Sequence, residues 1–173
     1  RRTTLVMTAG GPTITLGARV PDGTIIGARG PFAMFAPDTA LHRWFRDAYW
    51  KRYSTAPTYP AYKMAQAIFG VKSAWEKAQA ANGDTRPSQE QTAAAFEYLS
   101  FEGPGGRVGM IIGKGHQAVQ ETAYGTARRV RGETTLVDVR RYPASMTTPP
   151  DGVSSEEWIR TRFRAEAARH APQ

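Results

Sequence analysis

The residues that most constrain the fold are 44–75, where two aromatic-rich segments with helical spacing flank a proline-marked break. Asp38 is suited to cap the first helix, which we expect over residues 39–53. The second helix begins at Pro60, where a first-turn proline is tolerated, and ends near Asn82 and Gly83. Both helices carry apolar stripes that we expect to pack in a core, formed by Leu41, Trp44, Phe45, Ala48, Tyr49 and Tyr53 in the first and Ala61, Ala65, Ile68, Trp75 and Ala78 in the second.

Short runs of β-type composition lie on both sides of these helices. The runs at residues 5–7 and 24–27 precede the helices. After the second helix, the capping-box pair Ser88 and Gln91 predicts a third helix that runs to about residue 99. Strands are predicted further on over residues 107–112, 117–126 and 134–142, followed by a terminal helix capped by Ser154. This alternation of strands and helices indicates the α/β fold class.

Composition excludes several classes of function. The 23 lysine and arginine residues give a net charge of +8, but they are dispersed, so no nucleic-acid partner is predicted. Cysteine is absent, and the three histidines lie far apart, so the sequence predicts no disulfide, metal site or cofactor. The glycine runs match no phosphate-binding motif, and no G-x-S-x-G nucleophile motif is present. No catalytic residue is therefore predicted.

Two features remain as candidates for binding a small molecule. One is the glycine-rich loop over residues 8–13, which follows a predicted strand and offers backbone N–H groups to a carboxylate. The other is an aromatic set formed by Phe32, Phe35, Tyr59 and Tyr62. The alternative interpretation stays open: the glycines then serve only turn geometry, and the tyrosines are half-buried core residues.

Five sequence blocks carry a resemblance to a known family. In order, they are PDGTIIGARGPF, WFRDAYWKRYSTAPTYPAYKMAQAI, PSQEQTAAAFEYLSFEGPGGRVGM, GHQAVQETAYG and VRRYPA. This order resembles the later half of the periplasmic solute-binding proteins of ABC transporters, in the branch of the leucine/isoleucine/valine-binding receptors. The resemblance covers most of residues 3–150.

The resemblance implies the C-terminal half of a two-lobed type I periplasmic-binding-protein fold, with three-layer α/β lobes and a three-stranded hinge. Residues 1–36 would supply second-lobe strands and the ligand loop, and residues 37–105 the helical part of the first lobe. Residues 106–150 would form strands and the hinge return, and residues 151–173 a C-terminal helical tail. We expect the N-terminal half of the same protein to be a missing partner.

The resemblance also implies ligand contacts. The loop residues Thr8, Ala9, Gly10 and Gly11 would contact the ligand, together with Tyr59 or Tyr62 at the start of the second helix, and Phe32 is a weaker candidate. This loop has no carboxylate to meet the ammonium group of an amino acid. The expected ligand is thus an apolar or aromatic amino acid or a related carboxylic acid.

The implied function is a non-enzymatic periplasmic receptor, with its signal peptide removed or absent, that delivers this ligand to the membrane permease of an ABC transporter. Two alternatives stay open. A cytosolic small-molecule sensor or regulator could use the same fold, because a fold does not determine function. An α/β enzyme acting on a small acid is the more distant alternative.

Overall fold

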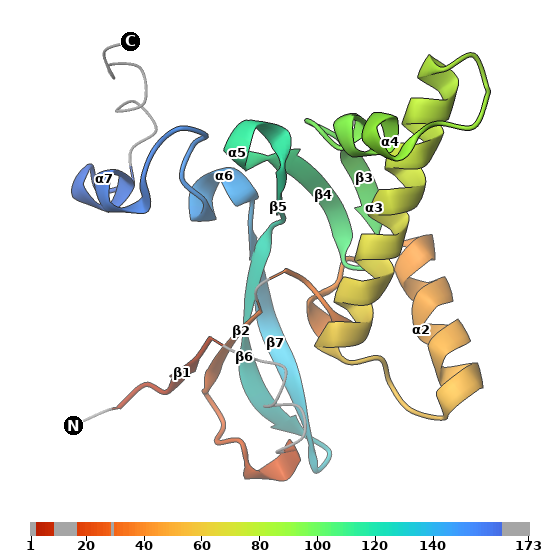
Figure 1. Cartoon of the computed structure of the whole chain (residues 1–173). Helices are drawn as coiled ribbons and strands as arrows, with labels where there is room; N and C mark the ends of the chain where they lie inside the picture. The colour runs from red at the N-terminus through yellow and green to blue at the C-terminus, as the bar shows by residue number, and fades with distance from the viewer. Residues whose placement is uncertain (1–2, 9–16, 29, 164–173) are drawn as a thin grey trace.

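The computed structural model describes residues 3–8, 17–28 and 30–163 (Figure 1). Its strands form two separate sheets, one with strand order β1-β2-β6-β7 and the other with order β3-β4-β5. The longer helices gather around the smaller sheet, on the right of Figure 1. The predicted mixed α/β class is confirmed.

The four-stranded sheet consists of β1 (Val6–Met7), β2 (Ile25–Ala28), β6 (Thr122–Val130) and β7 (Glu133–Tyr142). β1 pairs with β2 in parallel, whereas β6 pairs antiparallel with both β2 and β7. Alternate residues of a strand point to one face. Side chains from β2 and β6 accordingly join one core cluster, which includes Ile26, Ala28, Ala123 and Ala127.

The three-stranded sheet consists of β3 (Ser100–Gly103), β4 (Gly106–Ile111) and β5 (Gln117–Val119). The prediction of a single strand over residues 117–126 is wrong. β5 pairs with β4 in the small sheet, and after residues 120–121 the chain continues as β6 in the large sheet. This β5–β6 connection therefore joins the two sheets, as Figure 1 shows.

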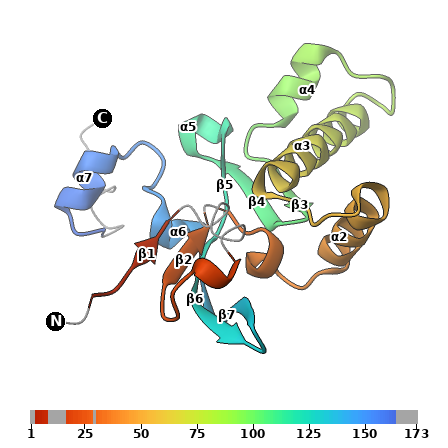
Figure 2. The same cartoon turned by 90° about the horizontal axis from the view of Figure 1, so that it is seen from below.

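Three helices follow one another between β2 and β3: α2 (Ala40–Tyr53), α3 (Tyr59–Ala81) and α4 (Gln89–Ala95). Figure 2 shows that α3 lies between α2 and α4. The expected cap of α2 by Asp38 is wrong, because the Thr39 side chain accepts the N–H of His42 instead. The capping box predicted for α4 is confirmed by reciprocal bonds between Ser88 and Gln91. This helix ends earlier than predicted, and Tyr98 just beyond it has a positive φ that no helix accommodates.

The remaining elements are short helical segments, of which α5 is irregular because Gly113 and Lys114 have positive φ. They are η1 (Gly17–Arg19), η2 (Ala33–Phe35), α5 (Ile112–Gly115), α6 (Ala144–Thr147) and α7 (Ser155–Arg160). The Ser154 hydroxyl accepts the N–H of Glu157 and so caps α7 as predicted. α6 lies between β7 and α7, in a stretch for which the sequence predicted neither helix nor strand.

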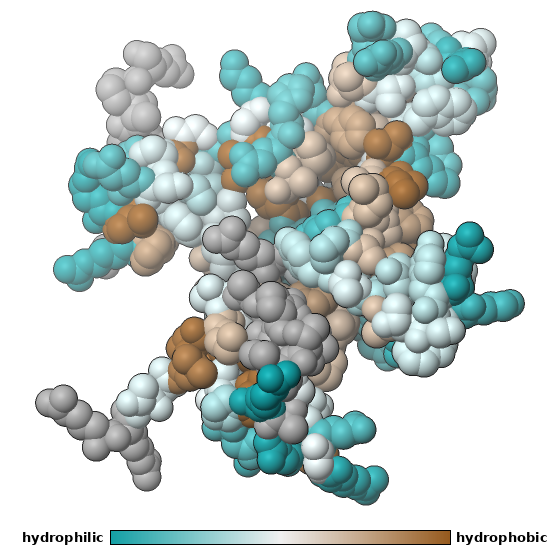
Figure 3. Space-filling model, turned by 60° about the horizontal axis from the view of Figure 1, so that its bottom comes forward, coloured by the Kyte–Doolittle hydropathy of each residue, from teal (hydrophilic) through white to brown (hydrophobic). Residues whose placement is uncertain are grey.

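One face of α3 is exposed although it is apolar. Met64 and Ile68 are 65% and 63% exposed, and Val71 and Trp75 continue the same stripe at spacings of three and four residues. Trp44 and Tyr53 of α2 are also exposed. The expectation that Ile68, Trp75, Trp44, Ala48 and Tyr53 pack in a core is therefore wrong for the described chain. Figure 3 shows apolar surface on the right of the molecule, which is the side where the helices lie in Figure 1.

α3 itself packs through small residues. Gly70, Ala74 and Ala78 are buried, and Gly70 lies directly against the ring of Phe101 in β3. With 23 residues α3 has the length of a membrane span, but neither it nor any other described helix is apolar enough to cross a bilayer.

Candidate functional site

The aromatic residues singled out in the sequence come together at the start of α3. The Phe32 ring meets those of Tyr59 and Tyr62 edge-on, at centroid distances of 5.4 and 6.2 Å. Phe35 and Phe45 complete the cluster. A proline at the first turn of α3 starts the helix here, which places Tyr59 and Tyr62 on neighbouring positions of one turn.

These residues differ in how deeply they are buried. Phe32 and Tyr62 are each only 2% exposed and belong to the core, whereas Tyr59 packs at its edge and stays partly accessible. A side chain buried on all sides by its own chain has little surface left for a ligand. The ligand role of all three residues stays a prediction, and Tyr59 is the one whose position suits it.

The Tyr62 hydroxyl has a buried partner that sequence reasoning missed. It lies 2.9 Å from Nε2 of His42 in α2, and His42 Nδ1 has no partner among the described residues. Burial lowers the pKa of His42, with the nearby Arg46 acting in the same direction, and burial raises the pKa of Tyr62. Both groups are therefore neutral at neutral pH, and they tie α2 to α3.

The predicted ligand loop is described only at its first residue. Thr8 follows β1 at the end of the strand and is exposed. Ala9, Gly10 and Gly11 lie outside the described residues. Their ligand role stays a prediction.

A polar cavity of about 240 Å³ lies at the junction of the two sheets, and Lys63 in its wall contacts the Tyr59 ring. Four separate segments line it: Gly30 after β2, Lys63 and Gln66 of α3, residues 117–120 and 122 around the β5–β6 connection, and Thr148 after α6. No motif connects these segments in the sequence, so nothing in it pointed to this cavity.

Lys63 is the cation of this cavity. Its ammonium donates to Oε1 of Gln120 at 2.6 Å and to Oε1 of Gln66 at 3.1 Å. It also lies 5.4 Å from the centroid of the Tyr59 ring, within the range of a cation–π contact. Burial lowers the pKa of Lys63, since removing water from around the ammonium disfavours its charged form.

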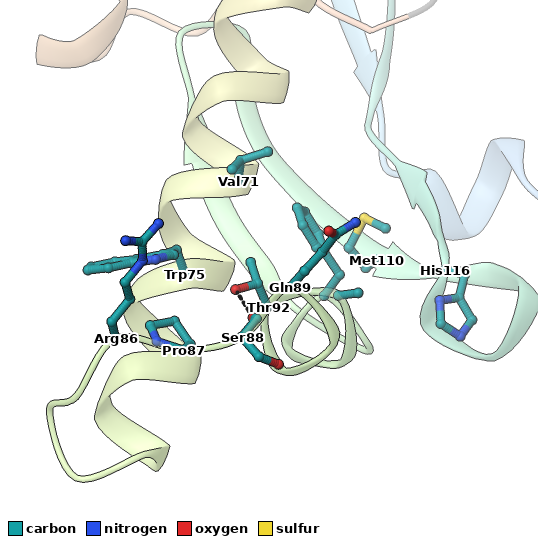
Figure 4. Close-up of a pocket in the computed structure, with 11 residues that line it drawn as sticks. Val71, Trp75, Arg86, Pro87, Ser88, Gln89, Thr92, Met110 and His116 are labelled. Atoms are coloured by element: carbon teal, nitrogen blue, oxygen red, sulfur yellow. Dashed lines mark hydrogen bonds between the residues drawn. The ribbon is translucent and has the colours of Figure 1, made fainter.

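A larger, open groove of about 660 Å³ runs between α3, α4 and β4 (Figure 4). Its floor is apolar, with Val71 and Trp75 from α3 and Met110 from β4, while Arg86 and His116 lie at opposite ends. Val71 and Trp75 also belong to the exposed stripe of α3. The groove is therefore continuous with this unpaired face of the helix, whereas the smaller cavity is lined by segments from both sheets.

No family model and no curated protein matches the chain. Solved structures do match. An ABC-type branched-chain amino acid transporter from Rhodopseudomonas palustris CGA009 aligns with a TM-score of 0.64 and 21% identity, over 82% of this chain and 36% of that one. An ABC transporter solute-binding protein from R. palustris BisB5, in complex with 3,4-dihydroxybenzoic acid, aligns with a TM-score of 0.55 and 20% identity, over 70% and 31%.

A third match is an ABC transporter solute-binding protein from R. palustris HaA2 in complex with p-hydroxybenzoic acid, with a TM-score of 0.51 and 13% identity, over 71% of this chain and 32% of that one. This chain thus has the fold of a part of ABC transporter solute-binding proteins, which confirms the resemblance. It spans about a third of the length of these structures. The domain boundaries at residues 36, 105 and 150 stay predictions.

Proposed function

We propose that this chain is part of a periplasmic solute-binding receptor that binds a small amino acid or a related carboxylic acid and delivers it to the permease of an ABC transporter. The observation that carries the proposal is the fold match over 82% of the chain with a TM-score of 0.64. Receptors of this kind bind and release their ligand without changing it, so the proposal includes no catalytic step.

The ligand class follows from the neighbours and from the chain's own residues. Two structural neighbours hold hydroxylated benzoic acids. In this chain, Tyr59 offers an aromatic ring at the edge of the cavity that contains the Lys63 ammonium. An acid with an aromatic or aliphatic body matches this combination of an apolar ring and a positive charge.

We further infer that the rest of the receptor covers the exposed stripe of α3. This chain spans about a third of the matched structures, and a monomeric protein rarely leaves a contiguous apolar stripe in water. Met64, Ile68, Val71 and Trp75 would then become core residues of the complete receptor, and the groove beside them would be filled by its other half.

A thermal-shift screen of amino acids, aromatic acids, sugars and metal ions tests the ligand class. Ligands that bind only the folded state raise its melting temperature. We expect apolar amino acids or aromatic acids to raise it, and the neutral analogue benzamide to have no effect. A response confined to sugars or metal ions would contradict the proposal. Accumulation of the protein in a cytosolic fraction would favour the sensor alternative.

A further inference from the structure

The charge of Lys63 has no counterion among the described residues. The ion pairs of the described chain involve other side chains, and the hydrogen-bond partners of Lys63 are two neutral amide oxygens. Lys63 is partly buried, and an adjacent anion would stabilise its partly desolvated charge. Amide oxygens and the face of Tyr59 supply dipoles but no negative charge. The cavity therefore has a positive potential that a small anion would neutralise.

Gln120, whose side chain lines the same cavity, carries a second unsatisfied group. Nε2 of Gln120 is buried and has no hydrogen-bond partner among the described residues. The orientation of this amide is determined by Lys63, because a flipped amide would place its NH₂ group against the ammonium. Gln120 thus keeps a donor in need of an acceptor, and a lysine ammonium has three donors, of which two have described acceptors.

Gly30 forms part of the cavity wall and lies close to Lys63 and Gln120. Gly30 has a φ of +80°, and a Cβ added there would collide with Nζ of Lys63 and with Oε1 of Gln120. Only glycine combines this backbone conformation with the close approach of two polar groups. The position of Lys63 therefore depends on the segment after β2 as well as on the β5–β6 connection.

From these observations we propose that Lys63 and Gln120 form a carboxylate-binding subsite at the junction of the two sheets. The ammonium would compensate the carboxylate charge, the Gln120 amide oxygen would hold the ammonium in position, and Tyr59 would contact the body of the acid. This subsite rests on the proposed function, since it names the residues that would recognise the acidic group of the receptor's ligand.

The test uses the 173-residue chain with benzoate as the probe, because all residues of the subsite lie within it. Binding is followed by NMR of the Lys63 side chain at millimolar benzoate, with benzamide as a neutral probe of the same shape. We expect benzoate to shift the Lys63 signals and to raise the pKa of this lysine, because an adjacent anion favours the charged form. Benzamide should do neither.

Substitutions then assign the binding energy. Lys63→Met should weaken benzoate binding about 10- to 100-fold, the range for losing a charged hydrogen-bond partner, and Gln120→Leu about fivefold. Lys72→Met, on the exposed side of the same helix, is the matched control and should change binding less than about twofold. Lys63→Met should change the melting temperature little, because removing the partly desolvated charge offsets the loss of its hydrogen bonds to Gln66 and Gln120.

Equal benzoate affinity of Lys63→Met and Lys72→Met would overturn the subsite, as would benzamide binding as tightly as benzoate. Sulfate displacing benzoate at equal concentration would show an unselective anion site and overturn the carboxylate class. The proposed function fails separately, if no amino acid or aromatic acid binds the wild-type protein. A ligand that binds wild type and Lys63→Met alike refutes only the subsite.

Discussion

Tyr62 contributes to the structure through several contacts at once. Its ring meets those of Phe32 and Phe45 edge-on, and its hydroxyl pairs with His42. Truncation of a buried aromatic leaves a cavity, so Tyr62→Ala should lower the free energy of unfolding by about 3–5 kcal/mol. Urea denaturation measures this loss. Tyr53→Ala, at an exposed position of α2, is the control and should stay within about 0.5 kcal/mol of wild type. Equal effects would place Tyr62 outside the core.

His42 should make stability depend on pH. Its pKa in the folded protein lies below the ordinary value of 6.5, because burial disfavours the charged ring. Below about pH 6.5 the unfolded chain binds more protons at this site than the folded chain, so the free energy of unfolding falls as the pH drops. His42→Gln keeps a polar group but removes the titration. Urea unfolding at pH 7 and pH 5 should show a smaller pH effect in this variant, and an unchanged effect would contradict the assignment.

At the scale of elements, Gly70 allows α3 to pack closely against β3, because glycine has no side chain to meet the Phe101 ring. A Cβ at this position would approach the Phe101 ring to 2.9 Å, so a branched side chain does not fit. Gly70→Val should therefore lower the free energy of unfolding by about 1–3 kcal/mol through overpacking. Ala67→Val on the exposed side of the helix measures the propensity effect alone. If both variants lose the same amount, α3 and β3 are not tightly packed at this point.

Local sequence signals predicted where the helices begin better than which of their faces are buried. The capping box at Ser88 and the proline at the start of α3 act within a few residues, and the structure has both helices where these signals indicate. Burial of the helix faces depends on partners distant in sequence. Ile68 and Trp75 therefore lie on the apolar stripe that the helical spacing predicts, but both are exposed in this chain. The strand over residues 117–126 failed similarly, because composition does not show where a strand changes sheets.

For the whole molecule, the exposed stripe of α3 predicts self-association. Met64, Ile68, Val71 and Trp75 form one apolar face, which a second copy could cover. Light scattering of the 173-residue chain should show a mass that rises with concentration. Exchanging Ile68 and Val71 for glutamine should reduce this rise without lowering the melting temperature, whereas Lys72→Gln beside them should not. A monodisperse monomer at all concentrations would contradict the interpretation of this face as an interface.

The candidate site could be predicted only where it is local. The tyrosines near the start of α3 belong to one recognisable block, and the structure brings them together with Phe32. Lys63 and Gln120 were missed because 57 positions separate them and only the path of the chain between the two sheets makes them neighbours. A lone lysine on an amphipathic helix is usually solvated, so its burial has no signature in the sequence.

β1 is an edge strand of the four-stranded sheet, since it is paired only with β2 among the described residues. Leu5 and Val6 are half exposed there, so apolar side chains accompany unpaired backbone N–H and C=O groups. Although β1 has only two residues, an exposed apolar edge strand can pair with the same strand of another chain. Prolonged incubation of the chain should thus yield fibrils that bind thioflavin T. Val6→Lys should delay them by placing a charge on the growing strand, and an unchanged lag time would show that fibrils begin elsewhere.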